Sequence, residues 1–109
     1  IGETCADAVV REMQEETGLT VVSPRLIGIK EWMKQDGQTR ALVLCYEASA
    51  YTGTLTSSAE GENRWMTREE IAAHPRGKSL LDFLPVYENP DVTSMFYAPD
   101  GDGWTAVYR

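Results

Sequence analysis

The sequence predicts a mixed α/β protein that forms one domain. The chain has 109 residues, of which 42% are hydrophobic and 25% are charged. This is an ordinary globular composition, and the length suits a single domain. Periodic segments follow one another in the order helix, strands, two helices and a hairpin-like tail, which is typical of an α/β fold.

The clearest predicted element is a helix over residues 5–17. Thr4 can cap its first turn, and Asp7 three residues later completes a capping-box-like pair. The apolar residues that follow at helical spacing are Ala6, Val9, Val10 and Met13. Gly18 is the residue type that commonly ends a helix, so we expect the helix to stop at Thr17.

Strands are predicted in the middle of the chain. Residues 19–22 and 25–33 are separated by Ser23-Pro24, and Asp36-Gly37 marks the turn that follows. The apolar run 41–51 predicts a long buried strand.

The rest of the chain returns to helices after a loop over residues 52–62 and a short predicted strand at 63–66. Thr67 to Glu70 form a second capping box, which opens a helix that Pro75 stops. A further helix is predicted at residues 79–87. The tail, residues 96–109, predicts two extended pieces around a turn.

The charge of the chain limits its partners. Ten basic and seventeen acidic residues give a formal net charge of −7, which disfavours binding to a nucleic-acid polymer. No stretch approaches the ~18 apolar residues of a membrane span, and no signal peptide opens the sequence, so we expect a cytoplasmic protein. Cys5 and Cys45 match no metal or redox spacing and predict two free thiols.

Three carboxylates crowd onto one side of the first predicted helix. At ~100° per residue, Glu12, Glu15 and Glu16 fall within about 100° of arc. Two such charges ~6 Å apart repel by roughly 3 kcal/mol at an effective dielectric of about 20. One Arg11 cannot neutralise three acids, whereas Mg²⁺ or Mn²⁺ would, because both prefer oxygen ligands. The alternative is a solvated acidic face that binds nothing.

The spacing around these acids resembles the Nudix box, E-x7-R-E-U-x-E-E-x-G-U, in which U is a bulky apolar residue. The matching positions are Glu3, Arg11, Glu12, Met13, Glu15, Glu16, Gly18 and Leu19. Less specific features follow the box in an order that is similar to that in MutT-type members. They are residues 51–55, 60–62, 65 and 69–71. This resemblance implies an α/β/α sandwich around a mixed sheet.

The resemblance also implies roles for individual residues. Glu12, Glu15 and Glu16 would bind the metal, and Arg11 would orient a catalytic carboxylate. Glu3 would support the helix and the metal site. A base or an additional metal ligand would come from a later loop, where Glu60 is preferred over Glu62. The implied catalytic set is Glu15, Glu16, Arg11 and Glu60, and the implied metal set is Glu12, Glu15, Glu16 and Glu60.

The implied activity is hydrolysis of a pyrophosphate linkage in a nucleoside triphosphate, with Mg²⁺ as cofactor and Mn²⁺ as a substitute. An oxidised nucleotide such as 8-oxo-dGTP is one candidate substrate. The alternatives are a hydrolase of ADP-ribose, nucleotide sugars or dinucleoside polyphosphates, and a non-catalytic module that binds nucleotides. We expect the protein to bind a small nucleotide and not to associate with a membrane. We also expect that it can form a homodimer.

A full Nudix box begins with a glycine six positions before Glu3, which would precede Ile1. We therefore expect residues 1–109 to form an N-terminally incomplete Nudix domain whose sheet lacks its N-terminal strands. An exposed sheet edge would follow, and a second copy of the chain could pair with it.

Several residues outside the box have two interpretations. Trp32, Trp65 and Trp104 could stack a nucleobase or pack in the core. Basic residues that could contact phosphates or face only solvent are Lys30, Lys34, Arg40 and Arg64. His74, the only histidine, is expected at the surface rather than in a catalytic role.

Overall fold

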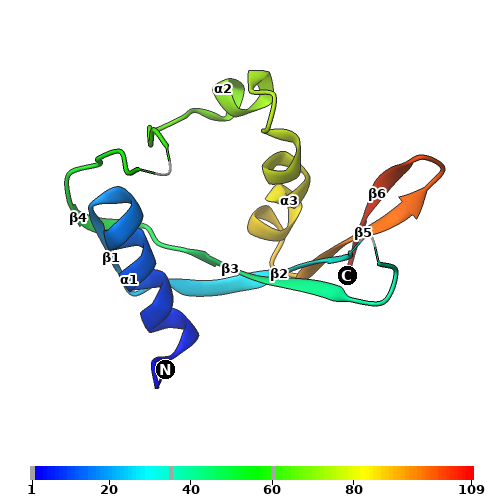
Figure 1. The fold of residues 1–109 in the computed structure, drawn as a ribbon, viewed down its shortest axis with the longest axis horizontal. Coiled ribbons are helices and arrows are strands. Elements are labelled where there is room, and N and C mark those ends of the chain that lie inside the picture. Colours follow the sequence, from blue (N-terminus) through cyan, green and yellow to red (C-terminus); the bar gives the residue numbers. More distant parts are fainter. Residues whose placement is uncertain (1, 35, 60) are drawn as a thin grey trace. The chain divides into compact units, whose positions relative to one another are not determined.

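The computed structural model describes residues 2–34, 36–59 and 61–109 (Figure 1). The elements, in chain order, are α1 (Cys5–Thr17), β1 (Leu19–Val22), β2 (Arg25–Met33), β3 (Arg40–Glu47), β4 (Ala50–Gly53), α2 (Arg68–Ala73), α3 (Lys78–Glu88), β5 (Ser94–Asp100) and β6 (Gly103–Tyr108). The chain divides into two compact units, residues 1–26 with 46–66 and residues 27–45 with 67–109.

The first unit consists of α1, β1 and β4. β1 and β4 form an antiparallel pair in which Leu19 lies opposite Gly53 and Val22 lies opposite Ala50. α1 contacts β1, to which it is joined by a single residue, Gly18 (Figure 1). Leu19 is buried.

The second unit contains most of a four-stranded sheet with the order β3-β2-β5-β6. β2 and β5 run parallel with Ile29 opposite Ser94, while β5 and β6 form the predicted antiparallel hairpin. The sheet is therefore mixed, as expected. Its core is the cluster of Phe83, Val86 and Met95, in which Met95 is fully inaccessible to solvent.

Most element predictions are confirmed. α1 and the first two strands have the predicted bounds, and α2 begins after the Thr67 cap and ends before Pro75. α3 is one residue longer at each end than predicted, and the tail forms two strands. Among the described residues, no helix is long and apolar enough to cross a membrane.

The prediction of one long buried strand at residues 41–51 is wrong. The run is divided at Ala48-Ser49, because β3 belongs to the four-stranded sheet while β4 pairs with β1. Leu42, Val43 and Leu44 are 60%, 40% and 43% exposed. The apolar composition of the run predicts burial, but β3 is an edge strand of its sheet, and its side chains are partly exposed.

The predicted short strand at residues 63–66 is also wrong, because none of these residues belongs to a strand. Side-chain bonds hold the segment instead. The backbone N–H of Asn63 donates to Ser57 Oγ at 3.1 Å, and the Trp65 ring packs against Tyr51 with 5.3 Å between centroids. These contacts replace a strand ladder.

Candidate active site

α1 is held at its N-terminus by the capping box that its sequence predicts. The Asp7 N–H donates to Thr4 Oγ1 at 3.0 Å, and the Thr4 N–H donates to Asp7 Oδ2 at 3.4 Å. These bonds satisfy donors that the first helical turn leaves without partners. The start of the helix, and so the direction in which its glutamates project, is fixed locally.

The C-terminus of α1 requires glycine. Gly18 adopts a left-handed conformation with φ of 79°, and its N–H donates to the Gln14 carbonyl at 3.0 Å. A Cβ on Gly18 would lie 2.8 Å from the Thr54 carbonyl oxygen and 2.9 Å from Thr56 Oγ1. The predicted role of this glycine, which is to end the helix where no Cβ fits, is confirmed.

Arg11 connects the acidic side chains of α1. Its Nη2 and Nε donate to Glu3 Oε1 at 2.7 and 3.0 Å, and its Nη1 donates to Glu15 Oε2 at 3.3 Å. Glu12 Oε1 lies 3.8 Å from Nη2. The hydrogen bond to Glu3 is the main cause that raises the pKa of Arg11 above its ordinary value, and the charge of Glu3 is the next. The guanidinium therefore stays charged and holds two of the box acids beside it.

The loop after β4 is bonded to the end of α1 through Asn63. Its Nδ2 donates to the main-chain oxygens of Glu16, at 2.6 Å, and of Thr56, at 2.9 Å. The Thr56 N–H donates to the Thr17 carbonyl at 2.7 Å. Sequence reasoning missed Asn63, although asparagine in a loop is a residue that commonly bonds to carbonyls.

The structure brings together only part of the predicted catalytic set. Arg11, Glu12 and Glu15 form one cluster with Glu3. Glu16 is on the same helix, and its backbone anchors the loop that contains the second group of candidates. Glu60, predicted as base and metal ligand, lies outside the described residues, and Glu62 is exposed.

A divalent cation fits the donor chemistry of α1. Glu12, Glu15 and Glu16 are exposed carboxylates, and hard oxygen donors are what Mg²⁺ and Mn²⁺ select. In the described part of the chain, however, no three acidic, histidine or cysteine side chains are grouped closely enough to hold a metal ion. Two of the three glutamates are oriented toward Arg11, so metal binding would require them to change rotamer.

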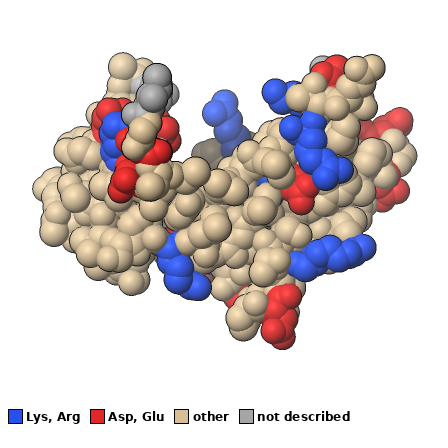
Figure 2. Space-filling view, turned by 90° about the horizontal axis from the view of Figure 1, so that it is seen from below, with Lys and Arg blue, Asp and Glu red and all other residues tan. Residues whose placement is uncertain are grey.

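Charges of both signs are spread over the protein surface. Figure 2 shows blue basic and red acidic side chains interspersed on the face drawn, without a continuous basic surface. Although Arg40 was a candidate for phosphate binding, it pairs with Glu31 at 3.2 Å. His74 is exposed at the C-cap of α2, as expected.

A capped helix that carries charge-paired glutamates at the spacing of the Nudix box, in a chain with a mixed sheet, is consistent with the class of Nudix proteins. The model of the NUDIX domain family matches residues 1–87, and the chain belongs to this family. It is 31% identical over 90 residues to the uncharacterized Nudix hydrolase YvcI of Bacillus subtilis, an alignment that covers 76% of this chain and 57% of the relative.

A solved structure supports the fold. The chain is similar to the mutator MutT protein from Bacillus halodurans with a TM-score of 0.73 and 24% identity. The match covers 98% of this chain and 74% of that one. The α/β fold of a MutT-like Nudix protein is therefore confirmed, and the chain spans a little over half the length of its curated relative.

Proposed function

We propose that this protein is a metal-dependent hydrolase of a pyrophosphate linkage in a nucleoside triphosphate, which releases a nucleoside monophosphate and pyrophosphate. The observation that carries the proposal is the set of three box glutamates on one capped helix, α1, with Arg11 bonded to Glu15 and to Glu3 just before the helix. An oxidised nucleotide such as 8-oxo-dGTP is the first substrate to test. Family membership supports the reaction class.

The charged residues of the box have separate roles in the proposed reaction. Glu12, Glu15 and Glu16 would hold Mg²⁺, which would neutralise phosphate charge and acidify a water molecule. Arg11, which Glu3 holds at 2.7 Å, would orient a catalytic carboxylate by an ion pair once Glu12 and Glu15 turn toward the metal. A carboxylate from the following loop, Glu60 by preference, would accept the proton of the attacking water.

The decisive experiment measures the products released from dGTP, 8-oxo-dGTP, ADP-ribose and diadenosine tetraphosphate with Mg²⁺, with Mn²⁺ and with a chelator. The product to detect is pyrophosphate for the two triphosphates and a nucleotide for the other two substrates. We expect one of the triphosphates to release pyrophosphate, and we expect this release to require the metal. Glu16→Gln, which removes one charge and keeps the shape, is expected to lower kcat at least a hundredfold. Glu69→Gln on α2 is the matched control, because Glu69 is an exposed glutamate outside the box.

Full activity of Glu16→Gln would overturn the metal assignment. Hydrolysis of ADP-ribose or of diadenosine tetraphosphate, but not of a triphosphate, would move the substrate to one of the other two classes. The absence of a grouped metal site among the described side chains favours a second candidate, a module that binds nucleotides without turnover. That candidate predicts nucleotide binding that is the same in the wild type and in Glu16→Gln, with no product.

We also propose that residues 1–109 are one Nudix domain, that the protein is cytoplasmic and that two copies associate. The two free thiols, Cys5 and Cys45, suit a reducing compartment. Sedimentation equilibrium tests the association, and a monomer at all concentrations would contradict it.

A further inference from the structure

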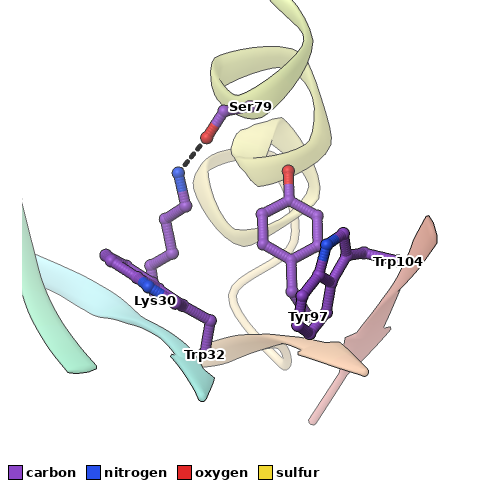
Figure 3. A pocket seen from close by; sticks show the side chains of 5 residues that line it. All are labelled: Lys30, Trp32, Ser79, Tyr97 and Trp104. Carbon is purple, nitrogen blue, oxygen red and sulfur yellow. Dashed lines mark hydrogen bonds between the residues drawn. The ribbon is translucent and has the colours of Figure 1, made fainter. Parts of the chain in front are cut away.

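A pocket in the second unit combines aromatic rings with a lysine ammonium. Its volume is about 370 Å³, and it is lined by Lys30, Trp32, Ser79, Tyr97 and Trp104. Figure 3 shows Trp32 on one side of the space, Tyr97 and Trp104 on the other, and the Lys30 side chain extended toward Ser79. None of these residues belongs to the Nudix box.

The strand register places these side chains on one face of the sheet. Lys30 and Trp32 are two residues apart on β2 and therefore project to the same side. Tyr97 on β5 is directly opposite Trp32, and Trp104 on β6 is opposite Pro99. Ser79, in the first turn of α3, closes the end of the pocket that Lys30 reaches.

The Lys30 ammonium is oriented but not neutralised. It donates to Ser79 Oγ and lies 5.9 Å from the Trp32 ring centroid and 5.6 Å from that of Tyr97. It forms no ion pair with any carboxylate in the described part of the chain. A half-buried cation that no carboxylate contacts directly can attract an anion.

Asp82 of α3 is already bonded to two other groups. Its Oδ2 accepts from Lys78 Nζ at 2.9 Å and from the Tyr97 hydroxyl at 2.8 Å. The second contact fixes the orientation of the Tyr97 ring. A continuation of the cavity past Ser79 and Tyr97 is lined by Lys78 and Arg76, which adds positive charge at the rim.

We propose that this pocket binds a nucleoside monophosphate group, with the base against the aromatic rings and the phosphate at Lys30. Aromatic rings can stack on any nucleobase, and the Lys30 ammonium at one end of the pocket can bind a phosphate. The volume lies within the ~300–1,000 Å³ of small-molecule sites. The choice of a nucleotide among planar anions rests on the proposed function.

Calorimetric titration of the full chain tests the proposal. The measurements use the Glu16→Gln variant in a chelator, so that turnover and metal do not contribute. The probes are the four deoxynucleoside monophosphates, their nucleosides and inorganic phosphate. We expect one monophosphate to bind at least tenfold more tightly than its nucleoside, and inorganic phosphate to bind more weakly still.

Two variants separate the roles of ring and charge. Trp104→Ala changes a side chain that is 54% exposed and should weaken binding of nucleotide and nucleoside alike, by about tenfold. Lys30→Gln should remove the preference for the nucleotide over the nucleoside. Trp65→Phe and Lys34→Gln are the matched controls outside the pocket, and they should change neither affinity.

The outcomes distinguish this pocket from the hydrolase activity. If none of the monophosphates binds, or if binding is unchanged in both Trp104→Ala and Lys30→Gln, the pocket proposal is overturned even where the wild type releases pyrophosphate. If both variants act as expected while no substrate is hydrolysed by the wild type, the pocket stands and the proposed hydrolase does not.

Discussion

Asn63 Nδ2 donates a hydrogen bond to the main-chain oxygen of Glu16, at 2.6 Å. The bond satisfies one of the last carbonyls of α1, which has no partner within the helix. The same amide group donates to the Thr56 carbonyl at 2.9 Å. One side chain therefore joins Asn63 and Thr56 to the end of α1, next to Glu16.

Replacing Asn63 should loosen this attachment. Asn63→Ala leaves two carbonyls without their donor, so we expect a loss of about 1–3 kcal/mol in the free energy of unfolding by urea. Asn63→Asp should cost at least as much, because its carboxylate would face two carbonyl oxygens. A loss within error for both variants would mean that the bond does not hold the loop. Gln38→Ala is the control at an exposed amide.

Gly18→Ala tests how tightly the end of α1 is packed. The new Cβ adds the cost of a left-handed backbone, of order 1 kcal/mol, and a clash with the Thr54 carbonyl oxygen at 2.8 Å. Gly37→Ala is a matched control, since Gly37 has φ of 70° with nothing within 4 Å of the Cβ position. We expect urea unfolding to show the larger loss for Gly18→Ala. Equal losses would remove the close approach as an explanation.

Arg11→Gln tests the charge balance of α1. Without the guanidinium, Glu3, Glu12 and Glu15 lose their shared positive partner, so their mutual repulsion should lower the melting temperature in a chelator by a few degrees. Mg²⁺ or Mn²⁺ should raise the melting temperature of the variant more than that of the wild type, because a cation would replace the lost charge.

The control for Arg11→Gln is Arg64→Gln, which removes an exposed arginine outside the ion pairs of the helix. A variant that melts like the wild type, and responds equally to metal, would show that the Arg11 contacts contribute nothing to stability. A metal response in neither protein would contradict the assignment of α1 as the metal-binding helix.

The second unit should lose stability at high pH through Tyr97. Burial, followed by the hydrogen bond to Asp82, raises the pKa of Tyr97 from 10.0 to about 12. Because the folded pKa is above the unfolded one, the stabilisation is complete below pH 10 and is lost as the pH rises toward 12. Urea unfolding from pH 9 to 12 should show a steeper decline for the wild type than for Tyr97→Phe.

Tyr51→Phe is the control for the loss of one phenol. Its stability to urea should decline between pH 9 and 12 as steeply as that of the wild type. Absorbance at 295 nm gives an independent measurement, since Tyr97→Phe should remove a phenol that titrates near pH 12. A variant whose stability declines as steeply as that of the wild type would show that another group causes the pH dependence.

The sequence predicted the elements whose signals are local. The Thr4 and Thr67 caps, the Gly18 terminus and the turn between β5 and β6 each depend on residues a few positions apart, and all four are confirmed. Helix spacing also predicted that Glu12, Glu15 and Glu16 share one side of α1, whereas their roles came from the resemblance to the Nudix box.

Features that depend on distant contacts were not predictable from the pattern. The run 41–51 has the composition of one buried strand, yet only its pairing partners reveal that it changes sheet at Ala48-Ser49. Asn63 could not be assigned to the Glu16 carbonyl from spacing, since four strands and a loop separate the two in the sequence. The pocket likewise gathers Lys30, Tyr97 and Ser79 from three separate elements.

The parallel pairing of β2 with β5 has a consequence for how the chain folds during synthesis. Residues 29–32 pair with residues 94–97, so the middle of the sheet cannot form until residue 97 has left the ribosome. Closing so long a loop is slow in comparison with forming α1, whose bonds are all local. We therefore expect α1, which carries the three glutamates, to form during synthesis before β5 and β6 complete the sheet of the second unit.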